Sequence, residues 1–145
     1  MCAMLPDVDV IGFSFGVRYG DLLGHRGLTH SIAFAAAVAS ICITRGVRLE
    51  MTRMRAWIYL FLATVSHGML DAATNGGLGV AFFSPLSNRR FFWPWRPLVV
   101  SPIGLNFFQS PRAVDVIYGE LLWLWLPTGM VVLIAYLWST RNGRR

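Results

Sequence analysis

Apolar residues dominate three long stretches of this chain, and polar residues interrupt them at short, well-defined points. Residues 27–44 are mostly small and apolar, residues 56–75 begin with aromatic residues and end before two glycines, and residues 116–139 contain the longest uninterrupted apolar run. Stretches of this length predict helices, and the first, at roughly 18 residues, is marginal for a membrane span of about 20. It suits a helix held inside a bundle equally well.

Residues 76–114 have a different character. They hold five of the seven prolines and several glycines, so we expect a long structured loop, interfacial or re-entrant, in place of a regular helix. The apolar run at residues 98–108 is too short to span a bilayer.

Composition indicates the class of protein. The 145 residues are 55% hydrophobic and only 14% charged, whereas about a quarter of the residues of soluble domains are charged. The sequence therefore predicts one all-α domain over residues 1–145, an integral membrane helical bundle with about three main hydrophobic helices.

The net charge of +6 comes from arginines near the ends of the apolar stretches. Cations in such places bind lipid phosphates, so we expect membrane lipids as partners and no nucleic acid. Four arginines between the first two helices mark the cytoplasmic side by their density: Arg45, Arg48, Arg53 and Arg55. The arginines of residues 89–112 argue against this orientation, because they place positive charge on the opposite loop.

All three histidines, and three of the five aspartates, lie in three short polar clusters beside these apolar runs. Ionisable groups in a membrane protein mark sites where they pair, face water or bind an ion. The candidate metal ligands are Asp7, Asp9, His25, His30, His67 and Asp71.

His67 and Asp71 are four residues apart, which places both on one face of a helix. Thr64 and Thr74 extend this polar stripe, and we expect it to point into the bundle. A hydrogen-bonded link between helices without metal explains the pair equally well.

Asp7 and Asp9 follow Pro6, and we expect an extended segment in which both carboxylates share a side. A helix cap or turn is the alternative for these two aspartates. We place His25 in a loop and Thr29 or Ser31 near a helix start, with one histidine as a ligand and the other supporting it or carrying a proton.

Imidazole and carboxylate ligands without cysteine suit Zn²⁺, or else Mn²⁺ or Fe²⁺. Such an ion can activate water for hydrolysis. We assign catalytic roles to Asp9, His30 and Arg26, the last as a phosphate-binding residue. Arg89 and Arg90 can bind phosphate in the same way, although a lipid-headgroup anchor is the favoured interpretation for this pair.

Three motifs carry a family resemblance: Leu-Pro-Asp-Val-Asp at residues 5–9, His-Arg-Gly-Leu-Thr-His-Ser at residues 25–31, and His-Gly-Met-Leu-Asp at the start of residues 67–77. They resemble the YdjM/YbcI-type family of predicted inner-membrane metal-dependent hydrolases. The resemblance implies a multi-pass protein of the bacterial inner membrane with a His/Asp metal site. Members of that family begin with a further helix, so we expect an N-terminally truncated chain.

A more distant similarity is to the zinc-dependent phospholipase C and single-strand nuclease group, in which Asp9, His25 or His30, His67 and Asp71 match the ligand pattern. Together these observations predict a membrane-bound metal-dependent hydrolase acting on a phosphate ester through a metal-activated water. The alternatives are a non-catalytic protein with a structural His/Asp cluster and, with less support, a metal or proton transporter.

Overall fold

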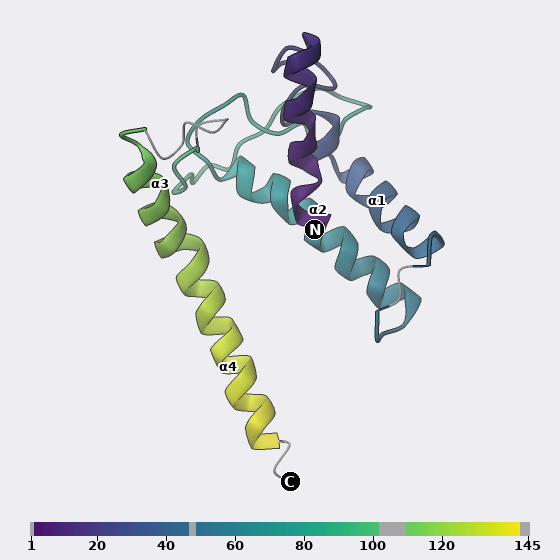
Figure 1. Ribbon diagram of the computed structural model, residues 1–145, viewed down its shortest axis with the longest axis vertical. Coiled ribbons are helices and arrows are strands. Elements are labelled where there is room, and N and C mark those ends of the chain that lie inside the picture. The colour runs from purple at the N-terminus through teal and green to yellow at the C-terminus, as the bar shows by residue number, and fades with distance from the viewer. Residues whose placement is uncertain (1, 47–48, 102–109, 143–145) are drawn as a thin grey trace. The chain divides into compact units, whose positions relative to one another are not determined.

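The computed structural model describes residues 2–46, 49–101 and 110–142 (Figure 1). Its elements, in chain order, are η1 (Cys2–Met4), η2 (Pro6–Phe15), η3 (Leu28–His30), α1 (Ile32–Thr44), α2 (Arg53–Ala72), α3 (Ala113–Glu120), η5 (Leu121–Trp125) and α4 (Leu126–Asn142). No β-strand forms within the described ranges, although isolated bridges occur, one of them antiparallel between Val80 and Phe91. The prediction of an all-helical protein is confirmed.

The chain divides into two compact units, Met1–Trp95 and Arg96–Arg145. In the first unit, α1 and α2 pack against each other. The buried positions of α2 recur every fourth residue and are mostly small: Ala56, Leu60, Thr64, Gly68 and Ala72. Because small side chains let helix backbones approach closely, this stripe allows tight packing of the kind common between membrane helices.

The ends of α1 and α2 differ from the expected ranges. The helix expected at residues 27–44 begins only at Ile32, because the Ser31 side chain caps it by accepting a hydrogen bond from the Phe34 N–H at 3.1 Å. The second helix spans Arg53–Ala72 where residues 56–75 were expected, since Thr52 caps its N-terminus. The predicted helix start near Thr29 and Ser31 is confirmed.

The segment containing Asp7 and Asp9 is a 3₁₀-helix, so the expected extended conformation is wrong. Proline disfavours helix only for the residue before it, and at the first helical position its fixed φ suits a helix. Leu5 is itself helical, with φ −60° and ψ −36°. With three residues per turn, the two aspartates lie on different sides of η2.

Three rows of side chains therefore run along η2. One row is buried and contains Pro6 and Asp9, and another exposes Leu5, Val8 and Ile11, the last with 57% of its surface accessible. Figure 1 shows η1 and η2 as the purple segment beside α2, and η1 packs against that helix. This arrangement turns Asp9 inward and leaves an aliphatic row outside.

The second unit contains a helical segment, Ala113–Arg141, that is long and apolar enough to cross a membrane. No other helix among the described residues meets that test, and α1 is a shorter apolar helix. The segment covers the helix predicted at residues 116–139 and includes one π-helical turn, η5, just before Pro127. A wider turn at this point suits proline, which lacks an N–H and crowds the preceding turn.

Residues 76–101 form the irregular structure expected between the second and third helices. The short apolar run predicted at residues 98–108 lies mostly in residues 102–109, outside the described residues.

Candidate metal centre

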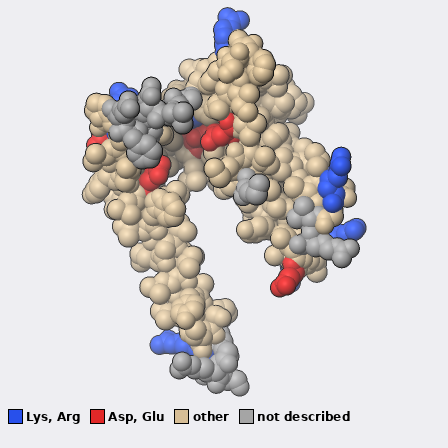
Figure 2. Space-filling view, viewed as in Figure 1, with Lys and Arg blue, Asp and Glu red and all other residues tan. Residues whose placement is uncertain are grey.

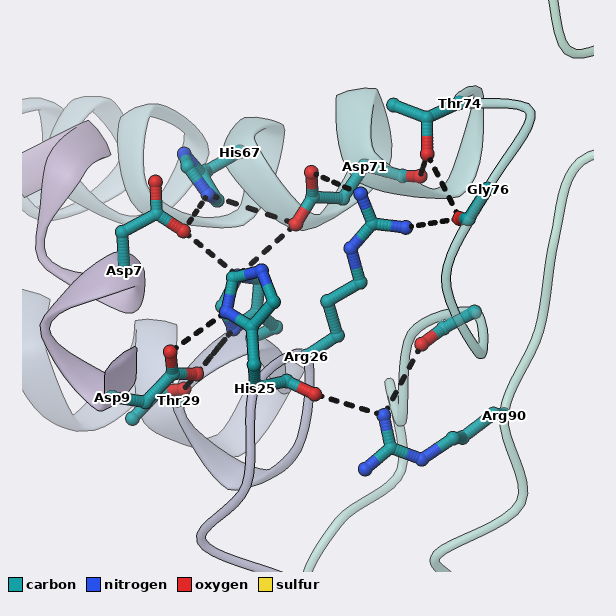
Figure 3. Close-up of polar contacts among 12 residues, drawn as sticks. Asp7, Asp9, His25, Arg26, Thr29, His67, Asp71, Thr74, Gly76 and Arg90 are labelled. Atoms are coloured by element: carbon teal, nitrogen blue, oxygen red, sulfur yellow. Dashed lines mark hydrogen bonds and ion pairs between the residues drawn. The ribbon is translucent and has the colours of Figure 1, made fainter. Parts of the chain in front are cut away.

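Six predicted ligands converge in the first unit, although they come from four separate segments of the chain. Asp7 and Asp9 are on η2, His25 is in the following loop, His30 ends η3, and His67 and Asp71 are on α2. Figure 3 shows the labelled side chains of this set facing one another. They form two groups that share His30, and we call them the open group (Asp7, His30, His67, Asp71) and the closed group (Asp9, His25, His30).

In the open group, one ligand atom from each residue lies within 4.8 Å of all the others. The His30 Nε2 atom is 3.5 Å from Asp7 Oδ1 and 3.1 Å from Asp71 Oδ2. The His67 Nε2 atom is 3.0 Å from Asp7 Oδ1 and 3.7 Å from Asp71 Oδ2. Ligand atoms at zinc distances of about 2.0–2.1 Å in a tetrahedron are separated by roughly 3.3 Å, and the four distances lie on both sides of that value.

Two atoms of the open group are buried without a hydrogen-bond partner among the described residues: His30 Nε2 and Asp71 Oδ2. They are 3.1 Å apart, yet they lack the geometry of a hydrogen bond. An unpaired buried polar atom costs free energy, and here a ring nitrogen faces a carboxylate oxygen across the centre of the group. The donor set, its spacing and these unpaired atoms fit a divalent ion.

The closed group differs because its atoms are already paired. The Asp9 carboxylate bonds to His25 Nδ1 at 2.8 Å with one oxygen and accepts a hydrogen bond from the Thr29 hydroxyl at 2.6 Å with the other. His30 Nδ1 lies 3.2 Å from Asp9 Oδ2 and 3.0 Å from Thr29 Oγ1. A proton on His30 Nδ1 directs the lone pair of Nε2 toward the open group, as in the carboxylate–histidine–metal arrangement of metalloproteins.

The two groups also differ in their access to solvent. The Asp7 side chain is 50% exposed, whereas the Asp9 and His30 side chains are 1% and 0% exposed. The ring of His25 packs edge-on against Tyr19, with centroids 5.3 Å apart. Water therefore reaches the open group at Asp7, and the closed group lies behind it in the protein interior.

The carboxylates and imidazoles shift one another's pKa values. Burial alone raises the pKa of Asp7 and of Asp9, but hydrogen bonds and charge from the histidines outweigh burial and hold both pKa values well below their usual range. Burial alone lowers the pKa of His30, but the neighbouring carboxylates of Asp7, Asp71 and Asp9 outweigh burial and raise the pKa to about 10. In the absence of metal, the cluster therefore holds a proton on His30 where the cation would bind.

Arg26 is buried, with 3% of its surface exposed, and its φ is +63°, in the left-handed region. Its Nη2 donates to Asp71 Oδ1 at 3.1 Å, and its Nη1 donates to the Gly76 carbonyl at 2.9 Å. The sequence suggested a phosphate-binding role, but both amino groups are already engaged with the protein. The contact to Asp71 Oδ1 turns the other carboxylate oxygen toward His30 and His67.

Gly68 allows η3 to approach α2 closely. A Cβ atom at this position would lie 2.9 Å from the His30 backbone carbonyl, which is closer than side chains tolerate. The glycine thus allows His30 to lie beside His67 and Asp71. Gly68 directly follows His67 in the sequence. An isolated glycine inside a helical pattern often marks a close contact, so this glycine is the signal from which the approach of η3 could have been predicted.

Arg90 lies beside this site, although the sequence analysis did not place it there. The sequence favoured a lipid-headgroup anchor for Arg89 and Arg90, and for Arg90 this is wrong, because its guanidinium donates to backbone carbonyls around His25. Nothing in the spacing of the sequence distinguishes it from Arg89, whose guanidinium lies 5.5 Å from the centroid of the Phe91 ring.

The sequence matches the YdjM inner membrane protein family over residues 1–142. The chain belongs to this family. It is 45% identical over 141 residues to "Inner membrane protein YbcI" of Escherichia coli (strain K12), a match that covers 97% of this chain and 80% of the relative. No solved structure matches it. The family resemblance drawn from the three motifs is confirmed, and it places the chain among bacterial inner membrane proteins.

Proposed function

We propose that this protein is a membrane-bound, metal-dependent hydrolase that acts on a phosphate ester at the membrane. Asp7, His30, His67 and Asp71 would hold a divalent ion, in the first place Zn²⁺, with Mn²⁺ or Fe²⁺ as alternatives. A divalent ion with such ligands acts as a Lewis acid and lowers the pKa of water, which is the chemistry that hydrolysis requires.

One observation carries the proposal. His30 Nε2 and Asp71 Oδ2 are buried, 3.1 Å apart and not hydrogen-bonded, within a set of ligand atoms spaced as around a small cation. Hydrogen bonding without metal, the alternative drawn from the sequence, accounts for the 3.0 Å bond between His67 Nε2 and Asp7 Oδ1, but it does not account for the two atoms without a partner. The half-exposed side chain of Asp7 supplies access for water and substrate, which a catalytic site needs.

Asp9 and Arg26 act in this proposal as positioning residues. Asp9 lies beside His30 Nδ1 and fixes the orientation and tautomer of the ring. Arg26 holds one oxygen of Asp71 so that the other faces the histidines. His30 is the shared residue, and His25 holds the second oxygen of Asp9.

The exposed residues around the site support a substrate at the membrane. Leu5, Val8 and Ile11 form an aliphatic row on η2 next to Asp7, and α2 exposes apolar residues such as Leu62 and Met69. Exposed apolar surface of this extent suits contact with lipid. A phosphate ester in a lipid headgroup would reach Asp7 from such a surface.

We also propose a multi-pass arrangement, in which α1 and α2 are embedded in the membrane and the helical segment Ala113–Arg141 crosses it. At 13 residues, α1 is about 20 Å long, shorter than the hydrocarbon core of about 30 Å, so it would reach only part of the way. The exposed Arg45, Arg53 and Arg55 lie where α1 and α2 are joined, and Figure 2 shows basic atoms at that end. The positive-inside rule would put them in the cytoplasm and the metal centre toward the outer face.

The test is metal analysis followed by activity. Protein purified in detergent should contain close to one divalent ion per chain, and Asp71→Asn should lose it, while the matched control Asp115→Asn on α3 keeps it. Wild type should then hydrolyse phosphomonoesters or phosphodiesters presented in micelles, and chelation should stop turnover. Wild-type protein without stoichiometric metal would overturn the proposal.

A structural metal site is the second candidate, because four protein side chains can also close a zinc site completely. It predicts stoichiometric metal without turnover, together with unfolding on chelation. The hydrolase predicts turnover and a site that accepts a water-sized ligand such as azide on Co²⁺-substituted protein.

A further inference from the structure

We propose that Arg90 is a positioning residue of the metal centre, which sets metal affinity by fastening the loop that carries His25 and Arg26. This inference rests on the proposed metal site but not on hydrolysis. It concerns a residue that touches none of the proposed ligand atoms.

The first observation is the set of atoms that Arg90 binds. Its Nη1 donates to the carbonyls of His25 at 3.0 Å and Gly79 at 3.4 Å. Its Nη2 donates to the carbonyls of Tyr19 at 3.1 Å and Asp21 at 3.3 Å. One guanidinium thus satisfies four backbone acceptors, three of them in the loop between η2 and η3, and Figure 3 shows the contact to the His25 backbone.

Of the three loop carbonyls, the loop's own backbone binds that of Asp21, through the Gly24 N–H. Residues 18–28 fold as successive turns, with hydrogen bonds from Gly24 N to Asp21 O and from Gly27 N to Gly24 O. Gly24 and Gly27 leave no room for a side chain, since a Cβ would lie 2.2 Å and 2.4 Å from backbone oxygens. The loop is therefore compact, and the Arg90 side chain links three of its carbonyls, those of Tyr19, Asp21 and His25.

Arg90 is itself held in place. The neighbouring Phe91 forms a pair of backbone hydrogen bonds with Val80, each 2.9 Å long. The Ala81 N–H donates to the Arg26 carbonyl at 3.0 Å. The segment from Val80 to Phe91 therefore also binds the backbone of Arg26, the residue after His25. Displacing the guanidinium would release the His25 carbonyl and leave the next residue, the buried Arg26 that donates to Asp71, with one fewer support beside it.

A chain of direct contacts connects Arg90 to the proposed metal ligands. The backbone of His25 is held by Arg90, its ring is bonded to Asp9, and Asp9 lies beside His30 Nδ1. In parallel, Arg26 holds Asp71. Loosening the loop therefore disturbs the supports of two proposed ligands, and substitution of such supports weakens metal binding about 10- to 100-fold.

The experiment compares Arg90→Ala with the neighbouring control Arg89→Ala in detergent-purified, full-length protein titrated with Co²⁺. Arg90→Ala should bind Co²⁺ about 10- to 100-fold more weakly, with an altered visible spectrum and faster hydrogen exchange over residues 18–28, whereas Arg89→Ala should match wild type. Arg90→Lys should stay impaired, because a point charge cannot replace a planar fork of donors. Millimolar guanidinium should restore part of the affinity of Arg90→Ala.

The outcomes separate this inference from the hydrolase proposal. If Arg90→Ala and Arg90→Lys both bind Co²⁺ with wild-type affinity and spectrum, Arg90 does not position the centre, even if the enzyme turns over substrate. If both lose affinity while wild type binds metal but hydrolyses nothing, the inference stands and the hydrolase fails. Absence of Co²⁺ binding by wild type would overturn both.

Discussion

The open and closed groups consist of the same residue types and share His30, but they differ in hydrogen bonding and in exposure to solvent. In the closed group, each Asp9 oxygen already has a close partner, and the side chains are buried. In the open group, His67 Nε2 and Asp7 Oδ1 are hydrogen-bonded, two buried atoms have no partner in the described part of the chain, and Asp7 is half exposed. The comparison indicates that satisfied hydrogen bonds, more than ligand type, distinguish a supporting cluster from a site that would take an ion.

The largest effect is expected for His30→Ala, because this residue belongs to both groups. We expect complete loss of the metal and a decrease of about 3 kcal/mol in the free energy of unfolding, since buried carboxylates lose their partner. Metal analysis and thermal unfolding in detergent measure the two effects. Retention of one metal per chain would mean that the open group is not centred on His30.

A matched pair, Asp71→Asn and Asp9→Asn, tests whether the open group binds the ion and the closed group only supports it. Asp71→Asn removes a proposed ligand and should abolish metal binding, whereas Asp9→Asn removes a support and should weaken binding about 10- to 100-fold. Isothermal titration with Zn²⁺ distinguishes the two results. Equal and complete losses would show that Asp9 is a ligand and that the closed group also binds an ion.

Gly68→Ala tests the close approach that brings the groups together. The added methyl group would lie 2.9 Å from the His30 carbonyl, so η3 must move away from α2. We expect a cost of about 1–3 kcal/mol in the free energy of unfolding, together with weaker metal binding. Gly129→Ala is the control, because a Cβ there meets nothing within 4 Å, and its unfolding temperature should not decrease.

The pH dependence of stability in chelator tests the charge states of the same groups without any substitution. The raised pKa of His30, about 10, contributes stability that is fully present below its unfolded pKa of 6.5 and is lost as pH rises toward 10. The lowered pKa values of Asp7 and Asp9 contribute stability that is present above 3.8 and is lost as pH falls. Metal-free protein should therefore unfold at its highest temperature between about pH 4 and 6.5.

Zinc should change that profile. Binding at Nε2 requires His30 to release its extra proton, so the increase in unfolding temperature caused by Zn²⁺ should grow from pH 6 to pH 9. The measurement is a pair of thermal unfolding series with chelator and with Zn²⁺. A constant difference across this range would argue against His30 as a ligand.

The hydrophobic pattern predicted much of the secondary structure. The helical segment Ala113–Arg141, which is long and apolar enough to cross a membrane, follows from the apolar run in the sequence. The pairing of His67 with Asp71 likewise follows from helical spacing. The apolar pattern misplaced the N-terminal ends of α1 and α2 by a few residues, because Ser31 and Thr52 cap these helices.

Contacts between distant residues decided the rest. Asp7 and Asp9 flank the ring of His30 because η2 is a 3₁₀-helix packed beside α2. Even Leu5, the residue before the proline, is helical in spite of its local preference for extended backbone. Arg90 turned inward because its guanidinium donates to four carbonyls that lie 11 to 71 residues away in the sequence. The sequence by itself determined which residue types were available and where helices form, since those depend on neighbours along the chain. Only the tertiary structure decided which polar atoms are paired and which remain for an ion, because hydrogen-bond satisfaction depends on atoms brought together by folding.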